Sequence, residues 1–254
     1  TDFDRTKGWA VRWTLRTNLA DLGDLALTGR YKSAGFGTIE QTVSSISQDN
    51  VSTFDVATNL ELGKFFPDKI GIRLPFHFDY SQTINNPRYN PLDPDVLLKD
   101  DLLSYRTEHE RDSIRHIVQD YTSITNFSFM NVRKERVGNA ASTRHFFDIE
   151  NWNMSYSYSR TYNRNIDIDH NDQTQNRLLF GYQYETNTKG LKPFNKVPLF
   201  KNKVFAILKD LTINYTPKSL TFKSEMNRTF QETLLRAKSQ GLVIMEPYYY
   251  QTFY

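Results

Sequence analysis

The sequence predicts an all-β protein whose strands run antiparallel in an up-and-down meander. Apolar and polar residues alternate along most segments, starting at Trp9, and a period of two puts them on opposite faces of a strand. Short turns and long polar loops separate these segments, as in a series of hairpins. The mean hydropathy is -0.62 and no run of about 18 apolar residues exists, which argues against helical membrane spans.

Each segment with this alternation is expected to form one strand. The segments are residues 9–19, 25–32, 54–62, 70–80, 152–162, 178–184, 211–215 and 220–226. Pro75 lacks an N–H and predicts a bulge or a break in pairing. The pattern of residues 125–132 predicts a strand less clearly. Tight turns in a strict meander should all fall on alternate connections, but the two halves of the chain are out of phase. Either residues 125–132 do not span the sheet, or a further strand lies between Val137 and Glu150.

The long connection at residues 81–122 is expected to contain short helices. Ile114, Ile117, Val118 and Tyr121 recur at helical spacing. The stretch DPDVLLKDDLL suggests another short helix, with Pro94 near its first turn.

Three features indicate that the apolar face meets lipid rather than a protein core. Residues 9–19 would span about 28 Å, given roughly 3.3 Å per residue and a tilt near 40°, which is close to the apolar height of a membrane barrel. Trp and Tyr cluster toward strand ends, as in aromatic girdles. Charged residues lie mid-strand on the opposite face. A soluble β-sandwich also alternates, so that reading stays open.

The alternation assigns two sets of residues to opposite sides of a barrel wall. The set predicted to face lipid is Trp9, Val11, Trp13, Leu15, Leu25, Leu27, Phe54, Val56, Leu60, Ile72, Leu74, Phe76, Phe78, Trp152, Tyr156, Tyr158, Phe180 and Tyr182. The set predicted to face a water-filled lumen is Arg12, Arg16, Arg30, Lys32, Asp55, Glu61 and Arg73.

No motif predicts an enzyme, a cofactor or a metal site. The chain has no cysteine, and its net charge of +3 gives no reason to expect nucleic acid. His109, Asp112 and His116 are compatible with one helix face, but a solvated face is the better interpretation. The run DIDHND lacks the glycine and the final glutamate of a calcium loop.

Several long stretches resemble the SprA/Sov family of Bacteroidetes. They are GWAVRWTLRTNLADLGDLALTGRYKSAGFGTIEQ, YNPLDPDVLLKD, DSIRHIVQDYTSITNFSFMNVRKER, WNMSYSYSRTYNRNID and LKDLTINYTPKSLTFKSEMNRTF. The resemblance implies an outer-membrane translocon of the type IX secretion system, which is also tied to gliding motility. It implies a very large single-chain barrel that exports folded cargo proteins, with a PorV-like barrel and a periplasmic plug protein as partners.

The resemblance further implies that residues 1–254 are an internal piece of a longer chain. We therefore expect one segment of a transmembrane β-barrel wall, in contact with outer-membrane lipid, with the helical insertion at about 81–122. Two other functions remain open: a receptor-like or lipid-assembly barrel of the outer membrane, similar to TonB-dependent receptors, and a secreted β-sandwich adhesin or carbohydrate-binding module.

Overall fold

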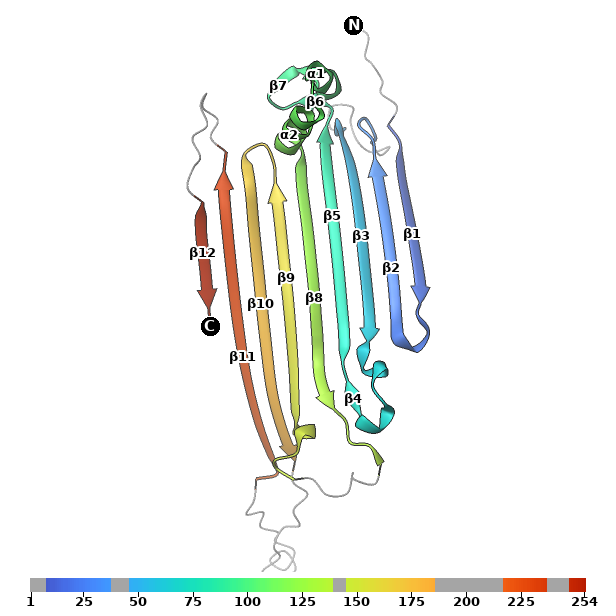
Figure 1. Cartoon of the computed structure of the whole chain (residues 1–254), viewed down its shortest axis with the longest axis vertical. Helices are drawn as coiled ribbons and strands as arrows, with labels where there is room; N and C mark the ends of the chain where they lie inside the picture. Colours follow the sequence, from blue (N-terminus) through green and yellow to red (C-terminus); the bar gives the residue numbers. More distant parts are fainter. Residues whose placement is uncertain (1–7, 38–45, 139–144, 186–216, 237–246) are drawn as a thin grey trace, which may run out of the picture.

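The computed structural model describes residues 8–37, 46–138, 145–185, 217–236 and 247–254. Ten strands form one open sheet, drawn from β1 at one side to β12 at the other (Figure 1). They are β1 (Ala10–Asn18), β2 (Gly23–Lys32), β3 (Asp49–Glu61), β4 (Ile72–Arg73), β5 (Pro75–Pro87), β8 (Asp120–Lys134), β9 (Trp152–Arg164), β10 (Ile168–Glu185), β11 (Ser219–Leu235) and β12 (Tyr248–Phe253).

Every strand pair in this sheet is antiparallel, and the strands follow one another in chain order. The exception is β4, which lies off the main path and pairs with the end of β8. The predicted all-β meander is therefore confirmed. The predicted strand at 211–215 lies outside the described residues.

Strand β8 decides whether residues 125–132 span the sheet, which the sequence left open. It runs for 15 residues and pairs along its length with β5 and β9, so residues 125–132 do span the sheet. Tight turns occur at both ends: β1 and β2 are joined at the lower end through η1 (Ala20–Leu22), and β9 and β10 at the upper end (Figure 1). The expectation that tight turns fall only on alternate connections was wrong, because short connections occur at both ends of this sheet.

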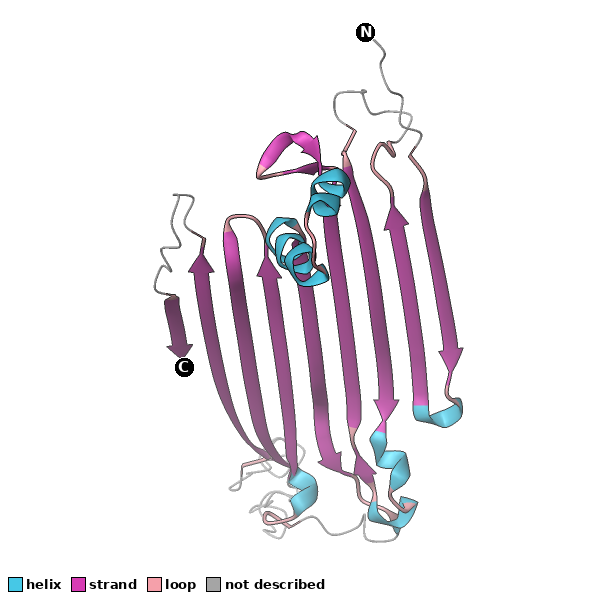
Figure 2. Cartoon of the chain, turned by 45° about the horizontal axis from the view of Figure 1, so that its top comes forward, coloured by secondary structure: helices cyan, strands magenta, loops and turns pink. Residues whose placement is uncertain are grey.

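The sheet is a single layer, and no second sheet covers either face within the described part of the chain (Figure 2). Among the described hydrophobic side chains, only Leu98, Val118 and Tyr182 are buried. Trp13 is 47% exposed and Leu15 is 54% exposed. A globular domain of this size normally buries most of its large apolar side chains. The described residues therefore form a wall rather than a packed core.

The break predicted at Pro75 is present and has a local cause. Strand β4 ends at Arg73 and β5 begins at Pro75, so Leu74 lies between two strands. The N–H of Leu74 donates to the Glu61 carboxylate at 2.8 Å, and its carbonyl accepts from the N–H of Leu62 at 3.0 Å. These bonds satisfy the backbone where the ladder is interrupted. Two short 3₁₀ helices, η3 (Leu62–Phe65) and η4 (Asp68–Ile70), complete the connection.

The helical insertion is confirmed but is shorter than expected, because β5 extends to Pro87 and β8 begins at Asp120. It contains the hairpin of β6 (Tyr89–Asn90) and β7 (Asp93–Leu97), then α1 (Leu98–Ser104) and α2 (Glu108–Val118). The helix predicted around Pro94 starts only at Leu98, because Asp93–Leu97 pairs with β6 as a short strand. No described helix is long and apolar enough to cross a membrane.

Helix α2 is fixed at both of its ends. At its start, Thr107 and Glu110 form a capping box, in which the Thr107 hydroxyl accepts the Glu110 N–H at 3.2 Å. At its end, the Arg236 guanidinium donates to the Ile117 carbonyl at 3.0 Å, and Arg164 donates to the His116 carbonyl. Cations are favourable at this end because the helix dipole is negative there. The insertion is thereby attached to the upper ends of β9 and β11.

We expect Gly71→Ala to destabilise the lower end of the sheet more than Gly138→Ala does. Both glycines have a positive φ, of 69° and 77°, which costs an alanine about 1–2 kcal/mol. A Cβ at Gly71 would also lie 2.2 Å from the Glu135 backbone oxygen, whereas no atom of the described residues lies within 4 Å of a Cβ at Gly138. Thermal unfolding of the two variants measures the difference, and equal losses would contradict the close approach of residue 71 to β8.

Candidate functional site

The register of the sheet separates an apolar face from a polar face. We call a row of directly paired residues across neighbouring strands a rung, and all members of a rung lie on the same face. One rung of the apolar face contains Leu60, Phe76, Phe129, Tyr156, Leu178 and Met226. One rung of the polar face contains Arg12, Arg30, Thr53, Thr83, Thr122, Asn163, Asn171 and Thr233.

Most of the residues predicted to face lipid share the apolar face. They come from β1, β2, β3, β5, β9 and β10, and several touch across strands: the rings of Trp13 and Phe54 are 6.3 Å apart, and those of Trp152 and Phe180 are 4.8 Å apart. Three depart from the expectation. Ile72 pairs with Lys134 at the lower end, and Leu74 lies in the break between strands. Tyr182 has the expected face but is only 5% exposed, because Phe146 lies against it and accepts its hydroxyl hydrogen bond at 2.6 Å.

The residues predicted to face the lumen lie on the polar face. Two of them, Glu61 and Arg73, have a structural role at the lower end of the sheet. Arg12 is directly opposite Arg30, and Asp55 offsets this like-charge pair by binding Arg30 at 3.3 Å. Arg16, Lys32 and Asp55 also belong to rungs of this face. In contrast, Glu61 accepts the Leu74 N–H, and Arg73 binds Glu135 at 2.9 Å, so both hold the strand break together.

The apolar residues form a band that crosses the sheet obliquely. In β1 the band occupies Trp9–Leu15, and in β11 it occupies Leu220–Met226. The two stretches share no rung. The rung of Trp13 leads through Gly29, Phe54, Gln82, Ser123, Tyr162 and Asp172 to Glu232. The rung of Met226 instead reaches Gly23, just below the paired part of β1. The band therefore descends steadily from β1 to β11.

The slope of the band across the sheet gives the tilt of the strands. This tilt is the angle between a strand and the line perpendicular to the band. Its centre moves by about ten residues along the strands over the seven strand pairs from β1 to β11. With a rise of about 3.3 Å per residue and a strand spacing of about 4.8 Å, this corresponds to a tilt of about 45°. Strands of transmembrane barrels are tilted by roughly 35–45°. The apolar pattern thus has the tilt of a barrel wall.

Above the band, the strands β8 to β11 carry polar residues on both faces, which the sequence reasoning missed. Arg160 and Asp172 stand on successive rungs of the apolar face, and Arg160 Nε donates to Asp172 Oδ1 at 2.9 Å. Glu232 stands opposite Asp172. The sequence contained a signal of this change, because the aromatic residues of β9 are followed on the same face by Arg160. Ile166 lies in the β9–β10 turn and Ile168 begins β10, so neither residue continues the alternation of β9.

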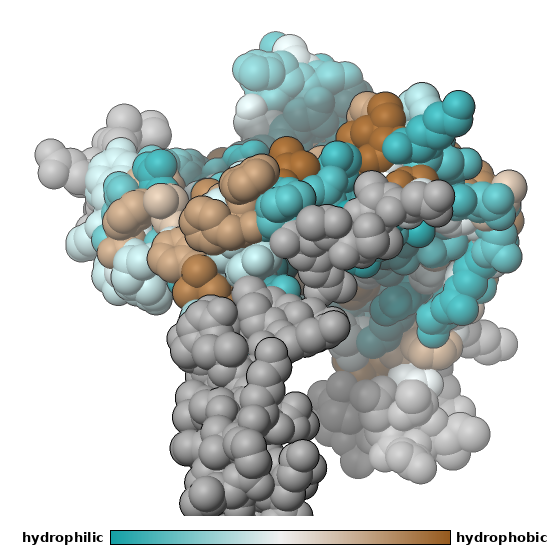
Figure 3. Space-filling view, turned by 90° about the horizontal axis from the view of Figure 1, so that it is seen from below, coloured by the Kyte–Doolittle hydropathy of each residue, from teal (hydrophilic) through white to brown (hydrophobic). Residues whose placement is uncertain are grey.

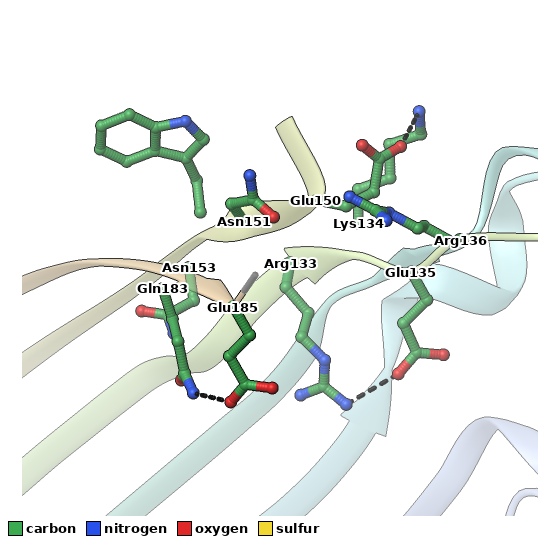
Figure 4. Close-up of a pocket in the computed structure, with 10 residues that line it drawn as sticks. Arg133, Lys134, Glu135, Arg136, Glu150, Asn151, Asn153, Gln183 and Glu185 are labelled. Carbon is green, nitrogen blue, oxygen red and sulfur yellow. Dashed lines mark hydrogen bonds and ion pairs between the residues drawn. The ribbon is translucent and has the colours of Figure 1, made fainter. Parts of the chain in front are cut away.

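At the lower end, a charged hollow of about 390 Å³ lies where β8 and β10 end and β9 begins (Figure 4). Arg133, Glu135, Gln183 and Glu185 point to one side of the sheet, while Lys134 and Glu150 point to the other. Lys134 binds Glu150 at 2.7 Å. In the view from below, brown apolar residues and teal hydrophilic ones lie side by side at this end (Figure 3). The hollow is the polar border of the apolar band.

The weaker candidate sites gain no support from the geometry. Among the described residues, no group of three or more His, Asp or Glu side chains is placed to hold a metal. Asp112 binds Arg115 at 2.8 Å on the exposed side of α2. In the run DIDHND, the Asp169 carboxylate binds Arg236 at 3.0 Å, and Asn171 accepts from Thr233 at 2.8 Å. These oxygens therefore take part in side-chain contacts that stabilise the upper end of the sheet.

The fold and its two faces define an open, single-layer β-wall, and one comparison relates it to known proteins. Residues 1–102 match the family model SprA_N, described as a motility related/secretion protein. The match covers β1 through most of α1 and confirms the resemblance to the SprA family over that part of the chain. The relationship is to proteins of motility and secretion, which is compatible with the cell envelope. No curated protein matches the chain in sequence.

We expect the lower end of the sheet to loosen in acid through Glu135. Hydrogen bonds from Arg73 and Arg133 hold the pKa of the Glu135 carboxyl below its usual range. A carboxyl with a depressed pKa in the folded state stabilises the fold above its unfolded pKa and loses that contribution as the pH falls through the folded value. The hydrogen-exchange protection factors of residues 71–74, which are corrected for the intrinsic exchange rate at each pH, should therefore fall below about pH 4. Glu135→Gln should remove this acid response, and an unchanged response in that variant would contradict the assignment.

Proposed function

We propose that this chain forms part of the wall of an outer-membrane β-barrel that exports proteins. The observation that carries the proposal is the oblique apolar band, whose slope gives the strands the tilt of a transmembrane barrel. In a soluble two-layer sandwich the apolar side chains would be covered by a second sheet. Here Trp13 and Leu15 remain about half exposed on a single layer, which favours acyl chains as their partner.

The polar face supports a water-filled passage. Between β3 and β11 it carries mainly hydroxyl and amide groups, among them Thr83, Ser128, Ser159 and Gln175. Its arginines are partly neutralised, since Arg30 binds Asp55 at 3.3 Å and Arg177 binds Glu225 at 2.8 Å. A surface without large apolar patches offers little to which a passing protein would adhere.

The family match supports secretion as the task of this passage. The whole protein would be a large translocon of the type IX secretion system, also serving gliding motility, with secreted cargo proteins as its substrates. It would act by passage rather than by catalysis. A PorV-like barrel and a periplasmic plug protein would be its partners. Large diameters require many strands, so the described sheet would be one arc of the wall.

Photo-crosslinking from two neighbouring residues tests the proposed passage. A photoreactive amino acid at Ser128 lies on the polar face, and the same group at Phe127 lies on the apolar face of the same strand. In cells that secrete, Ser128 should crosslink exported proteins and Phe127 should not. Crosslinks to cargo from Phe127 alone, or from both positions equally, would contradict the proposal.

We expect depth in the bilayer to follow the oblique band rather than the rungs. Bimane-labelled Trp13→Cys and Phe222→Cys should be strongly quenched by lipids with a mid-chain doxyl group. Glu232→Cys stands on the rung of Trp13 but above the band, and it should be quenched weakly. This segment has no native cysteine to interfere. Quenching at Glu232→Cys as strong as that at Trp13→Cys would show that the band is not the lipid boundary.

We also expect Trp13→Arg to impair membrane insertion, while Arg16→Gln folds almost normally. An arginine on the lipid face near the bilayer midplane costs about 2–4 kcal/mol. Arg16 lies on the polar face, where a neutral amide stays in water. Denaturant unfolding of the two variants in lipid vesicles compares them. If Arg16→Gln lost more stability than Trp13→Arg, the assignment of the faces would be reversed.

A further inference from the structure

A groove of about 680 Å³ lies between the helical insertion and the upper ends of β3 and β5. Figure 1 shows α1 above the end of β5 and α2 next to it, above β8. Leu98, Leu102 and Leu103 of α1 supply most of its apolar lining. Its volume lies within the range of specific binding sites, roughly 300–1,000 Å³. The proposed wall of the barrel makes no use of this groove.

Among the described residues, the charged side chains that line the groove all have one sign. They are Arg88, Lys99, Arg111 and Arg115, and no described aspartate or glutamate lines it. The carboxylates that bind two of these arginines, Glu108 and Asp112, are outside the lining. Within the described part of the chain, Lys99 forms no recorded ion pair. Cations beside apolar surface attract an anion more strongly than cations in open water do.

Contacts within the insertion and with the end of β5 hold the walls of the groove in place. Asn90 is buried and donates to the Asp101 carboxylate at 2.9 Å, which fixes α1 against the β6–β7 hairpin. Val118 is the most deeply buried side chain of α2, and Gln119 donates to Asn86 at the end of β5. A preformed site binds with a smaller loss of conformational entropy than one that must be ordered.

We propose that this groove binds a short acidic peptide segment that carries aliphatic side chains. The aliphatic side chains would pack against Leu98, Leu102 and Leu103, and the carboxylates would pair with Lys99 and the arginines. Apolar grooves between helices bind amphipathic peptides in this manner. The groove is formed by the insertion and the adjoining strand ends, so the proposal does not depend on which medium the apolar band faces.

Two matched peptides test the proposal on the purified full-length protein. Both are fluorescein-labelled amphipathic peptides with leucines at the same positions, one with glutamates and the other with lysines between them. Fluorescence anisotropy should show binding of the acidic peptide only. Lys99→Glu should weaken that binding at least tenfold. Arg106→Glu is the control, because Arg106 is an exposed cation of the same insertion outside the groove. It should leave binding unchanged.

A second pair of variants tests the apolar contact. Leu103 is 65% exposed and lines the groove, whereas Leu92 is 55% exposed and does not. Leu103→Asp should weaken binding and Leu92→Asp should not. Equal binding of the two peptides, or unchanged binding by both Lys99→Glu and Leu103→Asp, would overturn the proposal. Displacement of the acidic peptide by laurate at a similar concentration would also overturn it, by assigning the groove to an anionic amphiphile.

Discussion

The structure depends on an apolar face that no other layer of the described residues covers. Alternation along the strands places Trp, Leu, Val and Phe side chains on one side of a ten-stranded sheet. Each Å² of apolar surface that stays exposed to water loses about 25 cal/mol of hydrophobic stabilisation. An apolar face of this size is stabilised when another apolar medium or surface covers it. In the proposed barrel wall, membrane lipid would provide that medium on the side where the band lies.

The oblique course of the band ties together features that are separate in the sequence. Because the strands are tilted relative to the band, each strand meets it at a different point along its length. In β1 most of the strand belongs to the band, whereas in β11 only the lower part does. The upper parts of β8 to β11 are therefore free to be polar on both faces. Those parts carry Arg164 and Arg236, which hold the end of α2.

The helical insertion is consequently attached to a polar extension of the sheet and not to its apolar band. Its own small core, around Leu98 and Val118, contains two of the three buried hydrophobic residues among those described. Capping and guanidinium contacts fix α2, and side-chain amides fix α1. This gives the insertion a defined shape independent of the medium around the wall. The cationic groove is a product of that arrangement.

The sequence by itself determined the fold class, the antiparallel order and which apolar and charged residues share a face of the sheet, because a period of two is a local property of the backbone. It also located the break at Pro75, where a missing N–H interrupts the ladder. Only the tertiary structure decided that residues 125–132 span the sheet, that Tyr182 is covered by Phe146 and that Glu61 and Arg73 secure the strand break. These outcomes depend on partners far away in the chain. The slope of the band was equally inaccessible, since it follows from the register between strands, which no single segment encodes.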